Sequence, residues 1–141
     1  MRFTAQEAKA MSMNAALSPR TILRLDGVVC FAMGSALIGF SSMLAEPTGL
    51  SLGFLLVAGL LLLPSGLVIL AVSWPLHPPR LGVAVVVLGN LLWVVASFGV
   101  LFLGIVQPTR LGVGLIVGQA VAVLAIAALE ARPLSARLSH S

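Results

Sequence analysis

The chain has 141 residues, of which 60% are hydrophobic and only 9% are charged. Soluble domains average about 25% charged residues, so this composition excludes an ordinary water-soluble domain and indicates that lipid is the solvent. Eight basic and four acidic residues give a net charge of +4 without a dense basic run, which excludes a nucleic-acid-binding surface.

The segment before the first apolar run is polar and rich in Ala, Met and Ser. We expect residues 1–17 to form a short flexible tail, and Met1, Met11 and Met13 are alternative starts. The apolar run that begins near Ile22 continues for about 20 residues, whereas the apolar core of a signal peptide has about 7–15. We therefore expect a retained transmembrane helix rather than a cleaved leader.

Four apolar segments follow one another with short loops between them. Between Asp26 and Glu130 the charged residues are Glu46, Arg80 and Arg110 alone. Each segment exceeds the roughly 20 residues that cross about 30 Å of hydrocarbon as a helix. The predicted helices are 19–44, 50–73, 81–106 and 111–131. The sequence thus predicts one all-α membrane domain, 18–131, as an up-down-up-down four-helix bundle, followed by a C-terminal tail, 132–141.

The distribution of basic residues predicts the orientation. Cytoplasmic loops and tails of membrane proteins carry an excess of Lys and Arg. If both termini are cytoplasmic, seven of the eight basic residues in the chain lie on that side: Arg2, Lys9, Arg20, Arg24, Arg80, Arg132 and Arg137. We therefore expect a multi-pass protein of a bacterial inner membrane with both termini inside.

A weak internal similarity links the starts of the second and fourth predicted helices. Residues 47–53 (PTGLSLG) resemble residues 108–114 (PTRLGVG). One interpretation is a duplicated helical hairpin, as in transporters built from parallel repeats. The other is chance similarity between small and apolar residues at helix starts.

Asp26 is the main candidate for chemistry. It lies about two turns into the first predicted helix, where burial disfavours a charged carboxyl group, as a proton-coupling site requires. The alternative is an interfacial aspartate that is hydrated from the cytoplasm or paired with a basic residue of another helix. We also expect Glu130 to join Asp26, Arg24, Arg80 and Arg132 in a structural ring of charges on the cytoplasmic face.

Amides provide the second set of candidates. Asn90 and Gln119 lie near the middle of the third and fourth predicted helices, and we expect them to hydrogen-bond to each other across that hairpin. Asn90, Trp93 and Ser97 share one helix face. This face either lines a ligand pocket or packs inside the bundle.

Small residues recur at every fourth position on two helices, at Gly114, Gly118 and Ala122 and at Ser35 and Gly39. Such spacing predicts close helix packing, within the bundle or between copies of the chain.

Pro64 interrupts the second predicted helix and is expected to kink it, either as a hinge or as static shape. No residue cluster predicts a metal site or a cofactor, and we expect a protein that is not an enzyme.

The segments Leu23 to Val29, Asn90 to Ser97, and Pro108-Thr109 with Gly118-Gln119-Ala120 resemble small four-span integral membrane proteins of proteobacteria. The size and hairpin layout are also similar to those of the DoxX-like proteins. The resemblance implies a bacterial inner-membrane location but no activity.

The leading hypothesis is a non-enzymatic inner-membrane protein that acts as a structural or accessory subunit or as a homo-oligomer, with the lipid bilayer and other membrane subunits as its partners. One alternative is a small proton-coupled transporter or channel that uses Asp26. A second alternative is a membrane redox or quinone-linked protein.

Overall fold

The computed structural model describes residues 2–16 and 18–135. In that part the protein is helical, with six helices, namely α1 (Ala5–Ala16), α2 (Pro19–Gly39), α3 (Ser41–Thr48), α4 (Leu52–Val72), α5 (Arg80–Phe102) and α6 (Arg110–Ser135). The helices α2, α4, α5 and α6 are long and apolar enough to cross a membrane. These features confirm the predicted all-helical fold and agree with a multi-pass membrane protein.

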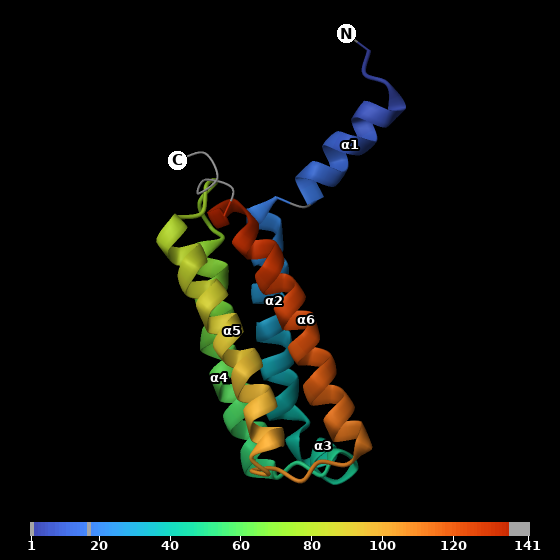
Figure 1. The fold of residues 1–141 in the computed structure, drawn as a ribbon, viewed down its shortest axis with the longest axis vertical. Coiled ribbons are helices and arrows are strands. Elements are labelled where there is room, and N and C mark those ends of the chain that lie inside the picture. Colours follow the sequence, from blue (N-terminus) through green and yellow to red (C-terminus); the bar gives the residue numbers. More distant parts are fainter. Residues whose placement is uncertain (1, 17, 136–141) are drawn as a thin grey trace.

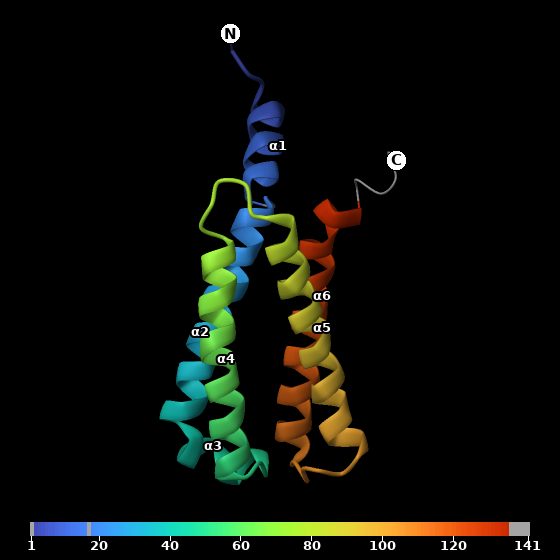
Figure 2. The same ribbon diagram turned by 90° about the vertical axis from the view of Figure 1, so that its left-hand side faces the viewer.

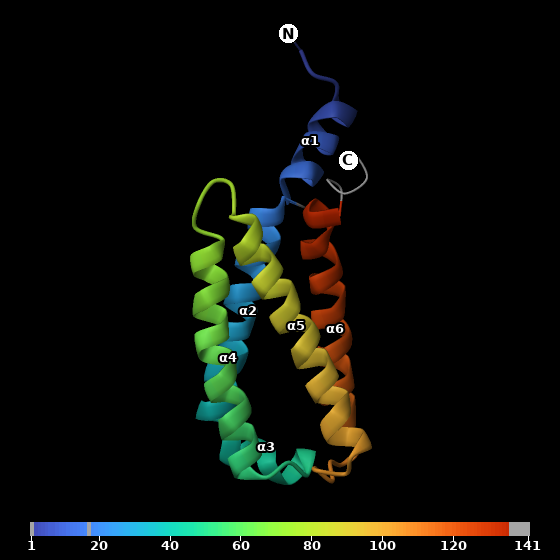
Figure 3. The same cartoon turned by 60° about the vertical axis from the view of Figure 1, so that its left-hand side comes forward.

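The four long helices form two hairpins that lie side by side (Figures 1 and 2). Helix α2 packs mainly against α4, and α5 packs mainly against α6. Contacts between the hairpins are sparser and run chiefly from α2 and α3 to α6. Helix α3 lies at the end of the molecule that is remote from α1 (Figure 3).

Glycine allows α2 and α4 to approach closely. A Cβ atom added to Gly34 would lie 2.9 Å from the carbonyl oxygen of Gly59, and one added to Gly66 would lie 2.9 Å from that of Gly27. Neither distance leaves room for a side chain. These glycines are seven residues apart on each helix, which places each pair on one face.

The first predicted helix, 19–44, is in fact two helices. Helix α2 ends at Gly39, and α3 begins at Ser41, after Phe40 has adopted the non-helical angles φ −113° and ψ 15°. The apolar run continues through this break, so the hydrophobic pattern gave no signal for it. Gly49, with φ of 68°, ends α3 in the left-handed region that favours glycine.

The other boundaries differ less from the predictions. Helix α5 ends at Phe102 rather than at residue 106, and Gly104 adopts a positive φ of 65° shortly after it. Helix α6 continues to Ser135, with Pro133 inside its last turn. Helix α4 continues from Leu52 to Val72 through Pro64.

Residues 5–16 form helix α1 where we expected a flexible tail. Thr4 and Glu7 form a reciprocal capping box at its start. The Thr4 amide donates to Glu7 Oε2 at 2.8 Å, and the Glu7 amide donates to Thr4 Oγ1 at 3.2 Å. Alanines in the following turns favour the helix, which extends away from the hairpins (Figure 1).

Polar contacts hold both ends of the two hairpins. At the α1 end, Arg20 donates to the carbonyl oxygens of Ser73 at 3.2 Å and Trp74 at 2.8 Å, just after α4 ends. A guanidinium group there satisfies free carbonyls and complements the helix dipole.

At the opposite end, Thr109 donates its amide to the carbonyl oxygen of Thr48 at 2.9 Å and its hydroxyl to that of Pro47 at 2.7 Å. The two similar segments therefore meet, but their roles differ. Ser51 caps α4 by accepting from the Phe54 amide, whereas Thr109 itself accepts from the Gly112 amide at the start of α6. Thr109 therefore caps its own helix, whereas its counterpart Thr48 ends α3 and Ser51 caps α4. This difference argues against an exact structural repeat.

Candidate functional site

Helix α2 carries Asp26 into the interior. Ser18 caps the helix by accepting from the Thr21 amide, and Pro19 occupies its first turn. Asp26 lies seven residues later, about 10 Å along the axis. It shares the buried face of α2 with Leu23 and Cys30, and only 1% of its surface is exposed.

Asn90 and Glu130 meet Asp26 from the other hairpin. Asn90 Nδ2 donates to Asp26 Oδ2 at 2.9 Å and to Glu130 Oε2 at 3.0 Å. Asn90 is 7% exposed and Glu130 is 1% exposed. We call these three residues, from α2, α5 and α6, the carboxyl cluster.

One amide nitrogen of Asn90 therefore bridges the two acids of the carboxyl cluster. Cys30 donates its thiol to Asp26 Oδ1 at 3.6 Å. Glu130 Oε1 is buried without a hydrogen-bond partner. A buried carboxyl oxygen without a donor is costly, and a proton held between Asp26 and Glu130 would supply one.

The predicted ring of charges is wrong. Arg24 and Arg80 are exposed, and so is Arg132. The described residues supply Asp26 and Glu130 with hydrogen bonds from Asn90 and Cys30 but from no basic side chain. The rotation of α2 explains this, because Arg24 is two positions from Asp26 and so projects from another face.

The predicted hydrogen bond between Asn90 and Gln119 is also wrong. Gln119 accepts from Trp93 Nε1 at 2.8 Å and donates to Ser97 Oγ at 2.9 Å. Asn90 belongs instead to the carboxyl cluster. Helices α5 and α6 thus carry two separate polar networks, and the one at Gln119 lies further from the α1 end.

Comparisons with known proteins supply no guide to this site. No family model, curated protein or solved structure matches the chain.

The small residues singled out by spacing do not pack helices together within the chain. A Cβ atom added to Gly114, Gly118 or Gly39 would have no neighbour within 4 Å, and Ala122 and Ser35 are exposed. The close contacts belong instead to the glycines between α2 and α4. The spacing of the small residues identified one face on each helix, but each helix packs against its neighbour through a different face.

The sequence analysis placed Asp26 and Glu130 in one ring of charges but gave no reason to expect direct pairing of the two acids. Cys30 shares the buried face of α2 with Asp26, whereas Met33 is 46% exposed and lies outside the cluster. The sequence of α6 did carry a signal for this pairing. Glu130 lies at helical spacing from Ala120 and Ala127, on the face that is buried in the structure. An acid on a buried face of an apolar helix requires a partner.

Proposed function

We propose that this protein is a non-enzymatic integral membrane protein that binds and translocates protons, alone or coupled to a substrate, through Asp26 and Glu130. This choice places the transporter hypothesis above the accessory-subunit hypothesis. The single observation that carries it is a pair of buried carboxyl groups in membrane-spanning helices with no basic partner among the described residues.

Structural needs alone do not account for two acids at this position. An ionised acid near the centre of a bilayer costs about 2.5–3.5 kcal/mol even on the most permissive scales. Two of them side by side would also repel each other, so the pair is best accommodated with one shared proton. An amide or hydroxyl would join the helices without that cost.

The location of the acids suits a moving proton. Asp26 belongs to one hairpin, and Asn90 and Glu130 belong to the other. Gain or loss of the shared proton therefore changes an interaction between two bodies that make few other contacts. Rocking of one such body against another is the usual basis of alternating access in small transporters.

We place the protein in a bacterial inner membrane as an up-down-up-down bundle with both termini in the cytoplasm. The support is the excess of Lys and Arg near both termini and at the start of α5, together with the resemblance to four-span proteobacterial proteins. In this orientation the carboxyl cluster lies in the cytoplasmic half of the bilayer.

Proton binding is tested first by infrared spectroscopy of the purified protein titrated with acid and base. We expect a carboxyl band that titrates in the wild type and disappears in Asp26→Asn and Glu130→Gln. The control is Glu46→Gln, because Glu46 is an exposed acid outside the cluster. A titrating band that persists in both cluster variants would contradict the assignment.

Proton movement is tested in liposomes that contain a pH-sensitive dye, with an imposed potential as the driving force. We expect each cluster variant to lower the flux at least about tenfold, corresponding to about 1.4 kcal/mol, while Glu46→Gln retains it. Thermal unfolding of each variant shows whether it is folded. Equal flux in the wild type and in Asp26→Asn would overturn the proposal.

A second candidate function is assembly with other copies of the chain. The observation that favours it is that Gly114, Gly118 and Ala122 form an outward face of α6 that none of the described residues covers. Small residues in this spacing permit close approach of helices in lipid.

A further inference from the structure

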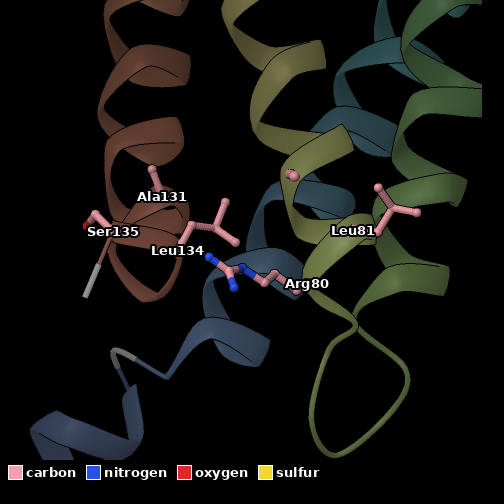
Figure 4. Close-up of a pocket in the computed structure, with 6 residues that line it drawn as sticks. Arg80, Leu81, Ala131, Leu134 and Ser135 are labelled. Atoms are coloured by element: carbon pink, nitrogen blue, oxygen red, sulfur yellow. The ribbon is translucent and has the colours of Figure 1, made fainter. Parts of the chain in front are cut away.

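A cleft lies between the start of α5 and the end of α6, at the same end of the molecule as α1 (Figure 4). It is a shallow, open hollow with a volume of about 680 Å³. The lining residues are Arg80, Leu81, Ala84, Ala131, Leu134 and Ser135. The carboxyl cluster is not part of this lining.

The walls of the cleft are almost entirely apolar. Leu81, Ala84, Ala131 and Leu134 supply this apolar lining, and the small side chains of the two alanines leave room in it. An apolar wall at the end of a membrane-spanning helix suits a hydrocarbon chain.

Among the described residues that line the cleft, Arg80 alone carries a charge. It extends from α5 toward Leu134 and Ser135 of α6 (Figure 4). No hydrogen bond or ion pair joins its guanidinium group to another described residue. A guanidinium group without a partner beside an apolar wall is suited to bidentate binding of a phosphate.

The surroundings favour an anion over a zwitterion. A second hollow of about 430 Å³ adjoins the cleft and shares Arg80 and Leu134 with it, and His77 also lines it. Neither hollow has an acidic residue in its lining. An ammonium headgroup would therefore find no carboxylate there, whereas a headgroup with net negative charge would meet complementary charge.

We infer that this cleft binds an anionic membrane phospholipid, with the phosphate on Arg80 and one acyl chain along Leu81, Ala84 and Ala131. Helix ends lie at the depth of the headgroups, so phosphate and chain fit the cleft in one orientation. The inference is independent of proton translocation, since it uses neither Asp26 nor Glu130.

The test is native mass spectrometry of the full-length protein with phosphatidylglycerol and phosphatidylcholine in competition. We expect the wild type to retain phosphatidylglycerol preferentially. Arg80→Gln should lower the affinity for phosphatidylglycerol about tenfold and abolish the preference. The matched control is Arg24→Gln, because Arg24 is an exposed arginine near the same end that lines neither hollow.

A second variant tests the apolar wall without changing the charge. Ala84→Phe places a ring in the cleft and should displace the lipid although Arg80 remains. Inorganic phosphate alone should not compete with phosphatidylglycerol, because it lacks the chain. Equal loss of lipid in Arg80→Gln and Arg24→Gln, equal binding of both lipids by the wild type, or displacement by inorganic phosphate would overturn the inference.

Discussion

Gly34 and Gly118 are both glycines inside membrane-spanning helices, yet their surroundings differ completely. A Cβ atom on Gly34 would lie 2.9 Å from the backbone oxygen of Gly59, whereas one on Gly118 would meet nothing within 4 Å. Backbone cannot move aside as the end of a flexible side chain can. The same substitution therefore has opposite consequences at the two positions.

We predict that Gly34→Leu lowers the free energy of unfolding by about 1–3 kcal/mol or more, because overpacking forces α2 and α4 apart. Gly118→Leu should leave the unfolding temperature of the isolated chain nearly unchanged. Thermal unfolding in detergent measures both. Native mass of Gly118→Leu also tests assembly, since loss of an oligomer in this variant alone would place the interface on α6. A Gly34→Leu protein as stable as the wild type would contradict the packing.

At the scale of single elements, α1 depends on local interactions because it extends away from the hairpins. The amide and hydroxyl of Thr4 both hydrogen-bond to the carboxylate of Glu7, at 2.8 and 3.1 Å. These bonds favour the charged form and hold the pKa of Glu7 below its usual range. Stabilisation of the helix is therefore complete above the unfolded-state pKa and is lost as the pH falls through the folded-state pKa.

We predict that acidification from pH 7 to about pH 3 unfolds the first turns of α1 while the hairpins remain intact. Backbone chemical shifts of residues 5–16 report the change. Glu7→Gln should make the helicity of α1 nearly independent of pH in this range. Retention of full helicity by the wild type at low pH would show that the capping box does not hold the helix.

At the scale of the whole molecule, basic residues gather at the α1 end of the hairpins, at Arg20, Arg24, Arg80 and Arg132, and this asymmetry defines the orientation to be tested. His77, between α4 and α5, and Gln107, between α5 and α6, are both exposed, whereas Cys30 is buried. In a Cys30→Ala background, a single cysteine at position 77 or 107 is therefore the only thiol that can be labelled, and it reports which side of the membrane its loop faces.

We predict that, in intact cells, a membrane-impermeant maleimide labels cysteine at position 107 and not at position 77. Position 77 should become reactive once the membrane is opened, because the loop before α5 is cytoplasmic by the positive-inside rule. The reverse pattern would invert the orientation. It would leave the fold and the carboxyl cluster as they are.

The membrane-spanning segments were determined by the sequence alone, because the cost of exposing polar backbone to lipid is a local property of each segment. Charge and proline placement defined four spans and their short connections. The break after Gly39 escaped prediction, because a change of direction inside an apolar run leaves the hydropathy unchanged.

Only the tertiary structure decided which side chains meet. Helical periodicity identifies the residues that share a face, but the rotation of each helix relative to its neighbours decides which face is covered. For this reason Asp26, Asn90 and Glu130 converge from three helices, while Gly118 lies on an open face. The acids were visible in the sequence, and their pairing depends on distances that exist only after the hairpins have packed.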